Sequence, residues 1–189
     1  MTQQDWQQAQ VDRIGEAIKT LRGDRSAQWL SDATDALGLR VNRSTISDIE
    51  TGRRKYVALH ELVIVAAALG TTPAALVTFG TVPDGELDLL PGRTVNGIEA
   101  VDWIGGKPLS RFSPAAVGLP EDHAPTAQLI AAARERNRVR DTLVKTQIGG
   151  LNDYPDPALV PALKERLTGI IRRIRELGGV IKESVDGSG

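Results

Sequence analysis

The sequence predicts a mainly all-α protein, and three observations support this fold class. Apolar residues recur at steps of three and four through residues 9–80, which is the spacing of one helix face. Glycines and prolines interrupt that pattern at short intervals, so the helices there are expected to be short. After a segment rich in proline and glycine, the same spacing returns over two longer stretches between residues 124 and 183.

Residues 1–80 are expected to form one domain of five short helices. The first helix carries a single apolar face, and the next three are each closed by a glycine. The fifth opens with a threonine cap followed by proline, a favourable pair for a helix start. The residues predicted to begin or end these helices are Gly23, Ser26, Gly38, Asn42, Gly52, Gly70, Thr72 and Pro73.

Residues 81–123 are expected to connect this domain to the C-terminal part through one short strand, at 86–90, and one short helix after Asn96. Residues 124–189 are expected to form a helical hairpin with a disordered tail. Its second helix starts at either Pro157 or Pro161, since proline suits a first turn. The seam between the two helices is predicted from apolar residues at steps of three, four and seven: Leu129, Ala132, Val139 and Leu143 on the first helix, and Leu163, Leu167, Ile170, Ile174 and Leu177 on the second.

The composition argues against several classes of function. The chain has no cysteine and only two histidines, which excludes thiol catalysis and cysteine zinc sites and disfavours imidazole sites. It has no P-loop, dinucleotide fingerprint or Gly-x-Ser-x-Gly motif, so we expect no catalytic residue, no metal and no cofactor. The longest nearly uncharged apolar stretch, 62–69, is far shorter than the roughly 20 residues that span a bilayer. A cytoplasmic protein without a membrane partner is expected.

Positive charge is concentrated locally, although the net charge is only −1. Residues 81–123 carry three Lys/Arg and seven Asp/Glu, whereas residues 124–189 carry eleven and eight. Within the balanced first 80 residues, the segment 40–55 holds five basic and two acidic side chains. Local basic segments of this kind favour an anionic partner.

Residues 41–55 read VNRSTISDIETGRRK, and a helix ending AAALG and the segment TTPAALV follow. This arrangement resembles the lambda-repressor-like (Cro/XRE-type) helix-turn-helix family over residues 9–79, the type found in phage-repressor-like transcriptional regulators. One departure from the family is the connection from Thr34 to Arg40, which is longer than its tight turn. An extended loop is therefore expected there.

The resemblance implies that the helix starting at Asn42 enters the DNA major groove and presents its first two turns to base edges. The expected base-reading residues are Asn42, Arg43, Ser44, Ser47 and Asp48. Arg43 suits guanine, while Asp48 either accepts from cytosine or orients Arg43 or Arg40. The expected contacts to the DNA backbone are Ser26, Arg40, Arg53, Arg54 and Lys55. The family also implies that Glu50 is buried against an arginine late in the first helix, here Arg22.

A second basic run lies on the first hairpin helix, where Arg134, Arg138 and Lys145 share a face. Three interpretations remain: a solvated outer face, an auxiliary DNA contact, or a surface for a partner protein. The hairpin is also a candidate for pairing two subunits through residues 124–183. A homodimer would read a palindromic operator, and a monomer with the hairpin on DNA would read a longer asymmetric site.

These features predict a sequence-specific double-stranded DNA-binding transcriptional regulator, and in particular a repressor. The alternative is an antitoxin or adaptor that regulates its own gene through the N-terminal domain and binds a partner protein through its C-terminal part.

Overall fold

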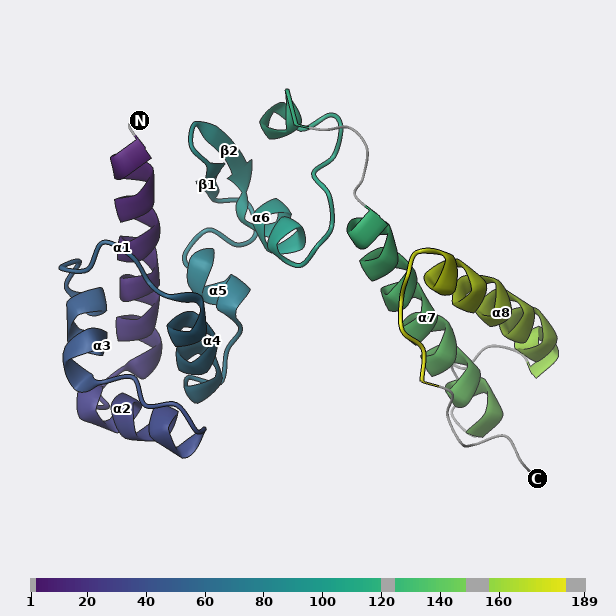
Figure 1. Ribbon diagram of the computed structural model, residues 1–189, viewed down its shortest axis with the longest axis horizontal. Helices are drawn as coiled ribbons and strands as arrows, with labels where there is room; N and C mark the ends of the chain where they lie inside the picture. Colours follow the sequence, from purple (N-terminus) through teal and green to yellow (C-terminus); the bar gives the residue numbers. More distant parts are fainter. Residues whose placement is uncertain (1–2, 120–124, 149–156, 183–189) are drawn as a thin grey trace. The chain divides into compact units, whose positions relative to one another are not determined.

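The computed structural model describes residues 3–119, 125–148 and 157–182. Over these residues the chain is mainly helical, which confirms the predicted fold class, with one two-stranded sheet. It divides into two compact units: residues 1–105 with 109–118, and residues 106–108 with 119–189 (Figure 1). No helix in the described ranges is both long and apolar enough to cross a membrane. The predicted disordered tail lies outside the described residues.

The first unit begins with five α-helices: α1 (Gln3–Arg22), α2 (Ala27–Ala36), α3 (Arg43–Glu50), α4 (Leu59–Ala68) and α5 (Pro73–Val77). The predicted caps stand where expected. Ser26 Oγ accepts from the backbone N of Trp29 at 3.0 Å, and Thr72 Oγ1 accepts from the backbone N of Ala75 at 3.2 Å. Asn42 occupies the N-cap position of α3, but its side chain makes no capping hydrogen bond.

One apolar core joins these five helices. Figure 1 shows α3 lying alongside α1, with α2 crossing beside them and α4 and α5 on the other side of α1. Each helix contributes at least one side chain that is less than 2% exposed: Ile18, Leu30, Ile46, Ile49, Val65 and Leu76. Since α2, α3, α4 and α5 are each too short to persist alone in water, this shared burial is what stabilises them.

Gly15 allows α1 and α3 to approach closely. A Cβ atom built at Gly15 would lie 2.4 Å from the carbonyl oxygen of Ile49, a distance that real atoms do not tolerate. Any side chain here would therefore push the C-terminal end of α3 away from α1. Glycine costs about 1 kcal/mol of helix propensity relative to alanine, and the close packing offsets that cost.

The middle segment contains a β-hairpin, in which only the first strand was predicted. β1 (Glu86–Leu90) pairs antiparallel with β2 (Arg93–Asn96), with Leu87 opposite Val95. Helix α6 (Gly97–Ile104) follows with the predicted cap, since Asn96 Oδ1 accepts from the backbone N of Glu99 at 2.8 Å. The segment belongs to the same unit as the five helices, and Trp6 Nε1 donates to the carbonyl of Asp88 at 3.0 Å.

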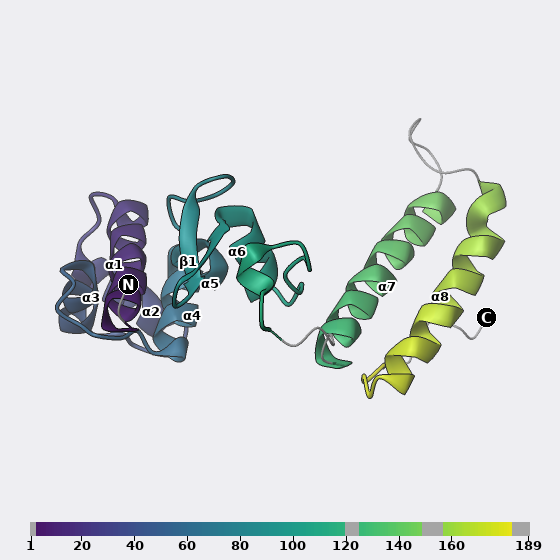
Figure 2. The same cartoon turned by 90° about the horizontal axis from the view of Figure 1, so that it is seen from above.

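The second unit contains the predicted pair of helices, α7 (Pro125–Ile148) and α8 (Val160–Glu176), which lie side by side in Figure 2. A short 3-10 turn, Pro157–Leu159, precedes α8, and Pro161 falls in its first turn. The predicted seam is present: Ala132 and Val139 of α7 are buried with Ile170 and Ile174 of α8. The apolar stripes of α7 and α8 are therefore packed against each other.

The predicted partner of Glu50 is confirmed. Arg22 at the end of α1 donates from Nε and Nη2 to the two carboxylate oxygens of Glu50 at 2.8 and 2.9 Å. The two side chains are only 15% and 9% exposed, and the hydrogen bonds to Glu50 raise the pKa of Arg22. This two-bond ion pair fastens the last residue of α3 to α1.

Replacing Glu50 with glutamine should destabilise the first unit, because the largely buried guanidinium of Arg22 loses its counter-charge. We expect a loss of about 3 kcal/mol in the free energy of unfolding, measured by urea titration. Glu16→Ala serves as the control, because it removes a carboxylate from the solvent-exposed face of α1. It should change the free energy of unfolding by less than about 0.5 kcal/mol. Equal effects of the two substitutions would contradict a stabilising role for the pair.

Candidate nucleic-acid interface

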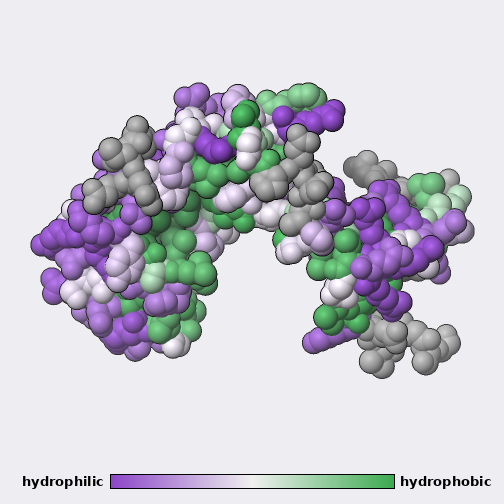
Figure 3. Space-filling model, turned by 45° about the horizontal axis from the view of Figure 1, so that its top comes forward, coloured by the Kyte–Doolittle hydropathy of each residue, from purple (hydrophilic) through white to green (hydrophobic). Residues whose placement is uncertain are grey.

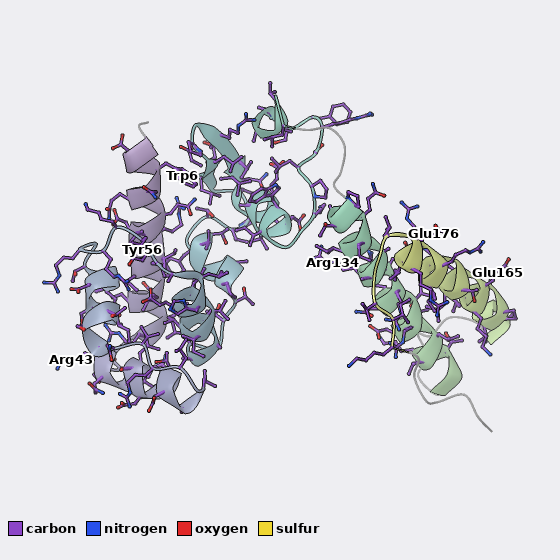
Figure 4. All side chains as sticks on the ribbon, viewed as in Figure 1. Trp6, Arg43, Tyr56, Arg134, Glu165 and Glu176 are labelled. Carbon is purple, nitrogen blue, oxygen red and sulfur yellow. The ribbon has the colours of Figure 1, made fainter. Side chains whose placement is uncertain are left out.

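The outward face of α3 brings together four of the predicted base-reading residues. Arg43 and Ser44 are exposed, while Ser47 and Asp48 are half-buried. Their spacing places them on one side of the helix, opposite the buried Ile46 and Ile49. Figure 4 shows the Arg43 side chain at the start of α3, directed away from the helices of the unit.

Asn42 completes this surface at the entrance to α3. Its side chain is exposed and makes no capping hydrogen bond, so the amide keeps its capacity to bond another molecule. The face therefore offers a guanidinium, an amide and two hydroxyls over two turns of helix. These are the groups that hydrogen-bond base edges in a major groove.

Asp48 is paired with Arg53, and not with either arginine considered in the sequence analysis. Arg53 Nε lies 2.9 Å from Asp48 Oδ1, and the side chains are 68% and 41% exposed. An exposed ion pair of this kind stabilises by at most about 1 kcal/mol, so a phosphate can compete for Arg53. The pair also neutralises the carboxylate on the outward face of α3.

Arg54 is held within the protein, in contrast to its neighbours in the basic run. Its Nη1 contacts both carboxylate oxygens of Glu61, at 2.8 and 3.0 Å, and the two side chains are 22% and 14% exposed. The same carboxylate accepts from the backbone N of Ala58 at the start of α4, at 3.0 Å. Hydrogen bonding to Glu61 raises the pKa of Arg54. These contacts give Arg54 a structural role in joining the loop after α3 to α4.

Arg40 and Ser26 also make contacts within the chain. The Arg40 guanidinium bonds Asp32 at 3.0 Å and Asp35 at 2.8 Å, and its pKa is raised by the hydrogen bonds to Asp35 and then Asp32. All three side chains are about half exposed, so this fork is open to water and to competing anions. The Ser26 hydroxyl is used by the cap of α2.

Lys55 and Tyr56, like Arg53, are exposed in the loop after α3. Tyr56 is 61% exposed, and the guanidinium of Arg54 lies 5.0 Å from its ring centroid (Figure 4 labels Tyr56). Tyr56 was not among the predicted contacts, although an aromatic residue directly after a basic run was the available signal. Its hydroxyl is a hydrogen-bond donor of the kind that contacts DNA phosphates.

The hairpin formed by α7 and α8 carries further basic side chains besides the three that were predicted. Arg134, Arg138 and Lys145 are exposed on α7, as expected from their spacing. Together α7 and α8 contain ten Lys/Arg and four Asp/Glu, and one of these acids, Glu135, is bonded to Arg166 at 2.7 Å. Besides Arg166, α8 carries four exposed basic side chains that were not predicted as DNA contacts: Lys164, Arg172, Arg173 and Arg175.

Hydrophilic residues dominate the edge of the first unit where α3 lies, on the face drawn in Figure 3, and much of the visible hairpin surface. Over the described part of the chain, no group of three or more His, Asp and Glu side chains is placed to hold a metal ion. What both surfaces offer is hydrogen-bond donors and positive charge. Comparisons of the chain with protein-family models, with curated proteins and with solved structures find no match.

Proposed function

We propose that this chain is a sequence-specific double-stranded DNA-binding protein that reads the major groove with α3. The observation that supports this most directly is the outward face of α3, with Arg43, Ser44 and Ser47 presented from a helix whose other side is anchored in the core. A rigidly held helix is what base reading needs, because hydrogen bonds to base edges tolerate little displacement.

In this proposal Arg43 donates two hydrogen bonds to a guanine, and Ser44, Ser47 and Asn42 bond neighbouring base edges. Lys55, Arg53 and Tyr56 contact phosphates beside the groove and supply affinity without sequence information. Asp48 holds Arg53 until a phosphate takes its place. Arg54 serves this surface indirectly, by fixing the loop that carries Lys55 and Tyr56.

Transcriptional repression, by occlusion of a promoter, is the biological role we propose for such a protein. It follows from the resemblance of residues 9–79 to helix-turn-helix repressors. Selection of bound duplexes from a random pool tests the DNA-binding proposal, and the expected result is one enriched sequence motif. A pool without enrichment would contradict it, and a protein partner bound in place of DNA would favour the antitoxin or adaptor alternative.

For the hairpin we propose an auxiliary DNA contact. The excess of basic over acidic side chains on both α7 and α8 favours a polyanion, and the apolar seam is already used between the two helices. If two subunits pair through residues 124–183, they must contact each other through a surface outside this apolar seam. The symmetry of the selected motif distinguishes these arrangements, because a homodimer selects a palindrome.

Arg43→Ala should weaken binding to the selected duplex by about 1–3 kcal/mol and relax the preference at one base position. Binding to an unrelated duplex should change far less, since Arg43 is assigned to a base. Fluorescence anisotropy with both duplexes measures this difference. Arg111→Ala removes an exposed arginine of the same unit outside α3 and serves as the control. An unchanged motif and affinity would remove Arg43 from the base-reading residues.

Lys55→Ala and Arg54→Ala should differ although the residues are neighbours. Loss of the exposed Lys55 should weaken binding to all duplexes about equally and reduce the salt slope by roughly one unit. Loss of Arg54 leaves the carboxylate of Glu61 unpaired, so it should lower the melting temperature more than Lys55→Ala does. An unaltered salt slope for Lys55→Ala would exclude its phosphate contact.

Substituting Arg134, Arg138 and Lys145 together with glutamine tests the hairpin in the full chain. If the hairpin contacts DNA, affinity should fall for every duplex and the salt slope should decrease by up to about three units. The mass in solution should stay that of the unsubstituted protein, measured by light scattering. A salt slope equal to that of the unsubstituted protein would assign the three side chains to a solvated face.

A further inference from the structure

The hydroxyl of Thr34 lies inside the first unit at the end of α2 and bonds the segment that leads to α3. The residue is 0% exposed. Its Oγ1 accepts from the backbone N of Val41 at 2.9 Å and donates to the carbonyl of Ser31 at 2.8 Å. Its own carbonyl accepts from the backbone N atoms of Leu37 and Leu39, at 3.2 and 3.3 Å. One side chain thus joins the end of α2 to the residue that precedes the cap of α3.

Backbone hydrogen bonds from Leu37, Gly38 and Leu39 close the end of α2, but few other side-chain contacts hold the connection that follows. Of residues 37–42, only Val41 is buried. The fork of Arg40 on Asp32 and Asp35 is exposed to water, and such surface pairs contribute little. Burial of Val41 fixes where its side chain lies but leaves rotation of the backbone, whereas the bond from its N–H to Thr34 is directional. The Thr34 hydroxyl is therefore the buried contact that fixes how α3 begins.

We propose that Thr34 is a positioning residue for sequence reading by α3, an inference that rests on the proposed function. Hydrogen bonds to base edges require placement within roughly 0.5 Å, while charge–phosphate contacts tolerate larger shifts. Loosening the start of α3 therefore weakens binding to the cognate duplex more than binding to an unrelated one. Thr34 touches no DNA in this proposal, and it acts through the position of Asn42 and Arg43.

The test compares Thr34→Val with Thr34→Ser in the full chain. Valine has nearly the shape of threonine but leaves the N–H of Val41 without a partner, and serine keeps the hydroxyl. The readout is the ratio of affinities for the selected duplex and an unrelated duplex at one salt concentration. We expect this ratio to fall roughly tenfold in Thr34→Val, which corresponds to the loss of about one good hydrogen bond, and to stay within about threefold in Thr34→Ser.

Leu76→Val in α5 is the control for general destabilisation, since Leu76 is fully buried but lies in a different helix from the connection. A smaller folded fraction lowers both affinities by the same factor, so this control should leave the ratio unchanged. A second readout needs no DNA: hydrogen exchange of the Val41 amide should become faster in Thr34→Val than in Thr34→Ser.

An unchanged affinity ratio in Thr34→Val, or an equal fall in Thr34→Ser, would overturn the role of Thr34 while leaving the proposed function intact. Unchanged exchange at Val41 would overturn it as well, because the hydroxyl would then not hold the connection. An unsubstituted chain that binds both duplexes equally would instead contradict the proposed function, and with it the role of Thr34 in reading sequence.

Discussion

An eight-residue helix cannot persist alone in water, and this constraint governs how the first unit is built around α3. Three contacts hold the helix from different directions. Ile46 and Ile49 insert into the core, Gly15 lets α1 approach the last turn, and the carboxylate of Glu50 binds Arg22. Every inward position of α3 is therefore committed to the fold. Its outward side chains take no part in this anchoring.

The basic residues around α3 divide into two groups by how strongly the protein holds them. Arg22 and Arg54 make two-bond contacts with partly buried carboxylates, and releasing either would leave an unpaired acid in a poorly solvated site. Arg53 and Arg40 form exposed pairs that an incoming phosphate can replace at small cost. The first group shapes the surface, whereas the second group and the exposed Arg43 and Lys55 have charge to offer a ligand.

Local patterns in the sequence were sufficient to predict several helix ends, because caps, glycine stops and apolar spacing act within a few residues, but they did not predict that α1 begins as early as Gln3. Ser26, Thr72 and Asn96 cap the helices that they were expected to cap. The partner strand Arg93–Asn96 was missed, since only Val95 in it is buried and no alternation is visible. The dipeptide Pro91-Gly92 is typical both of the end of a strand and of a turn between two paired strands, so it did not indicate that a second strand follows.

Side-chain partners distant in sequence were predicted only where a family pattern supplied them. The Arg22–Glu50 pair came from such a pattern, whereas nothing in the spacing of residues 53–61 tells Arg54, which binds Glu61, from Lys55, which is exposed. The Thr34 bond to Val41 was equally inaccessible, because a threonine near a helix end is normally read as a surface residue.

The hairpin shows how charge and packing limit each other in a small unit. Its seam is interrupted by Arg136, whose Nε is buried without a hydrogen-bond partner among the described residues, and such an unsatisfied donor costs about 1–3 kcal/mol. Its ten basic side chains also repel one another across the two helices. Both penalties reduce the stability of the free hairpin, and a bound polyanion would relieve the second. A surface that gains stability when an anion binds is consistent with a DNA contact and gives no advantage to a hairpin that only pairs subunits.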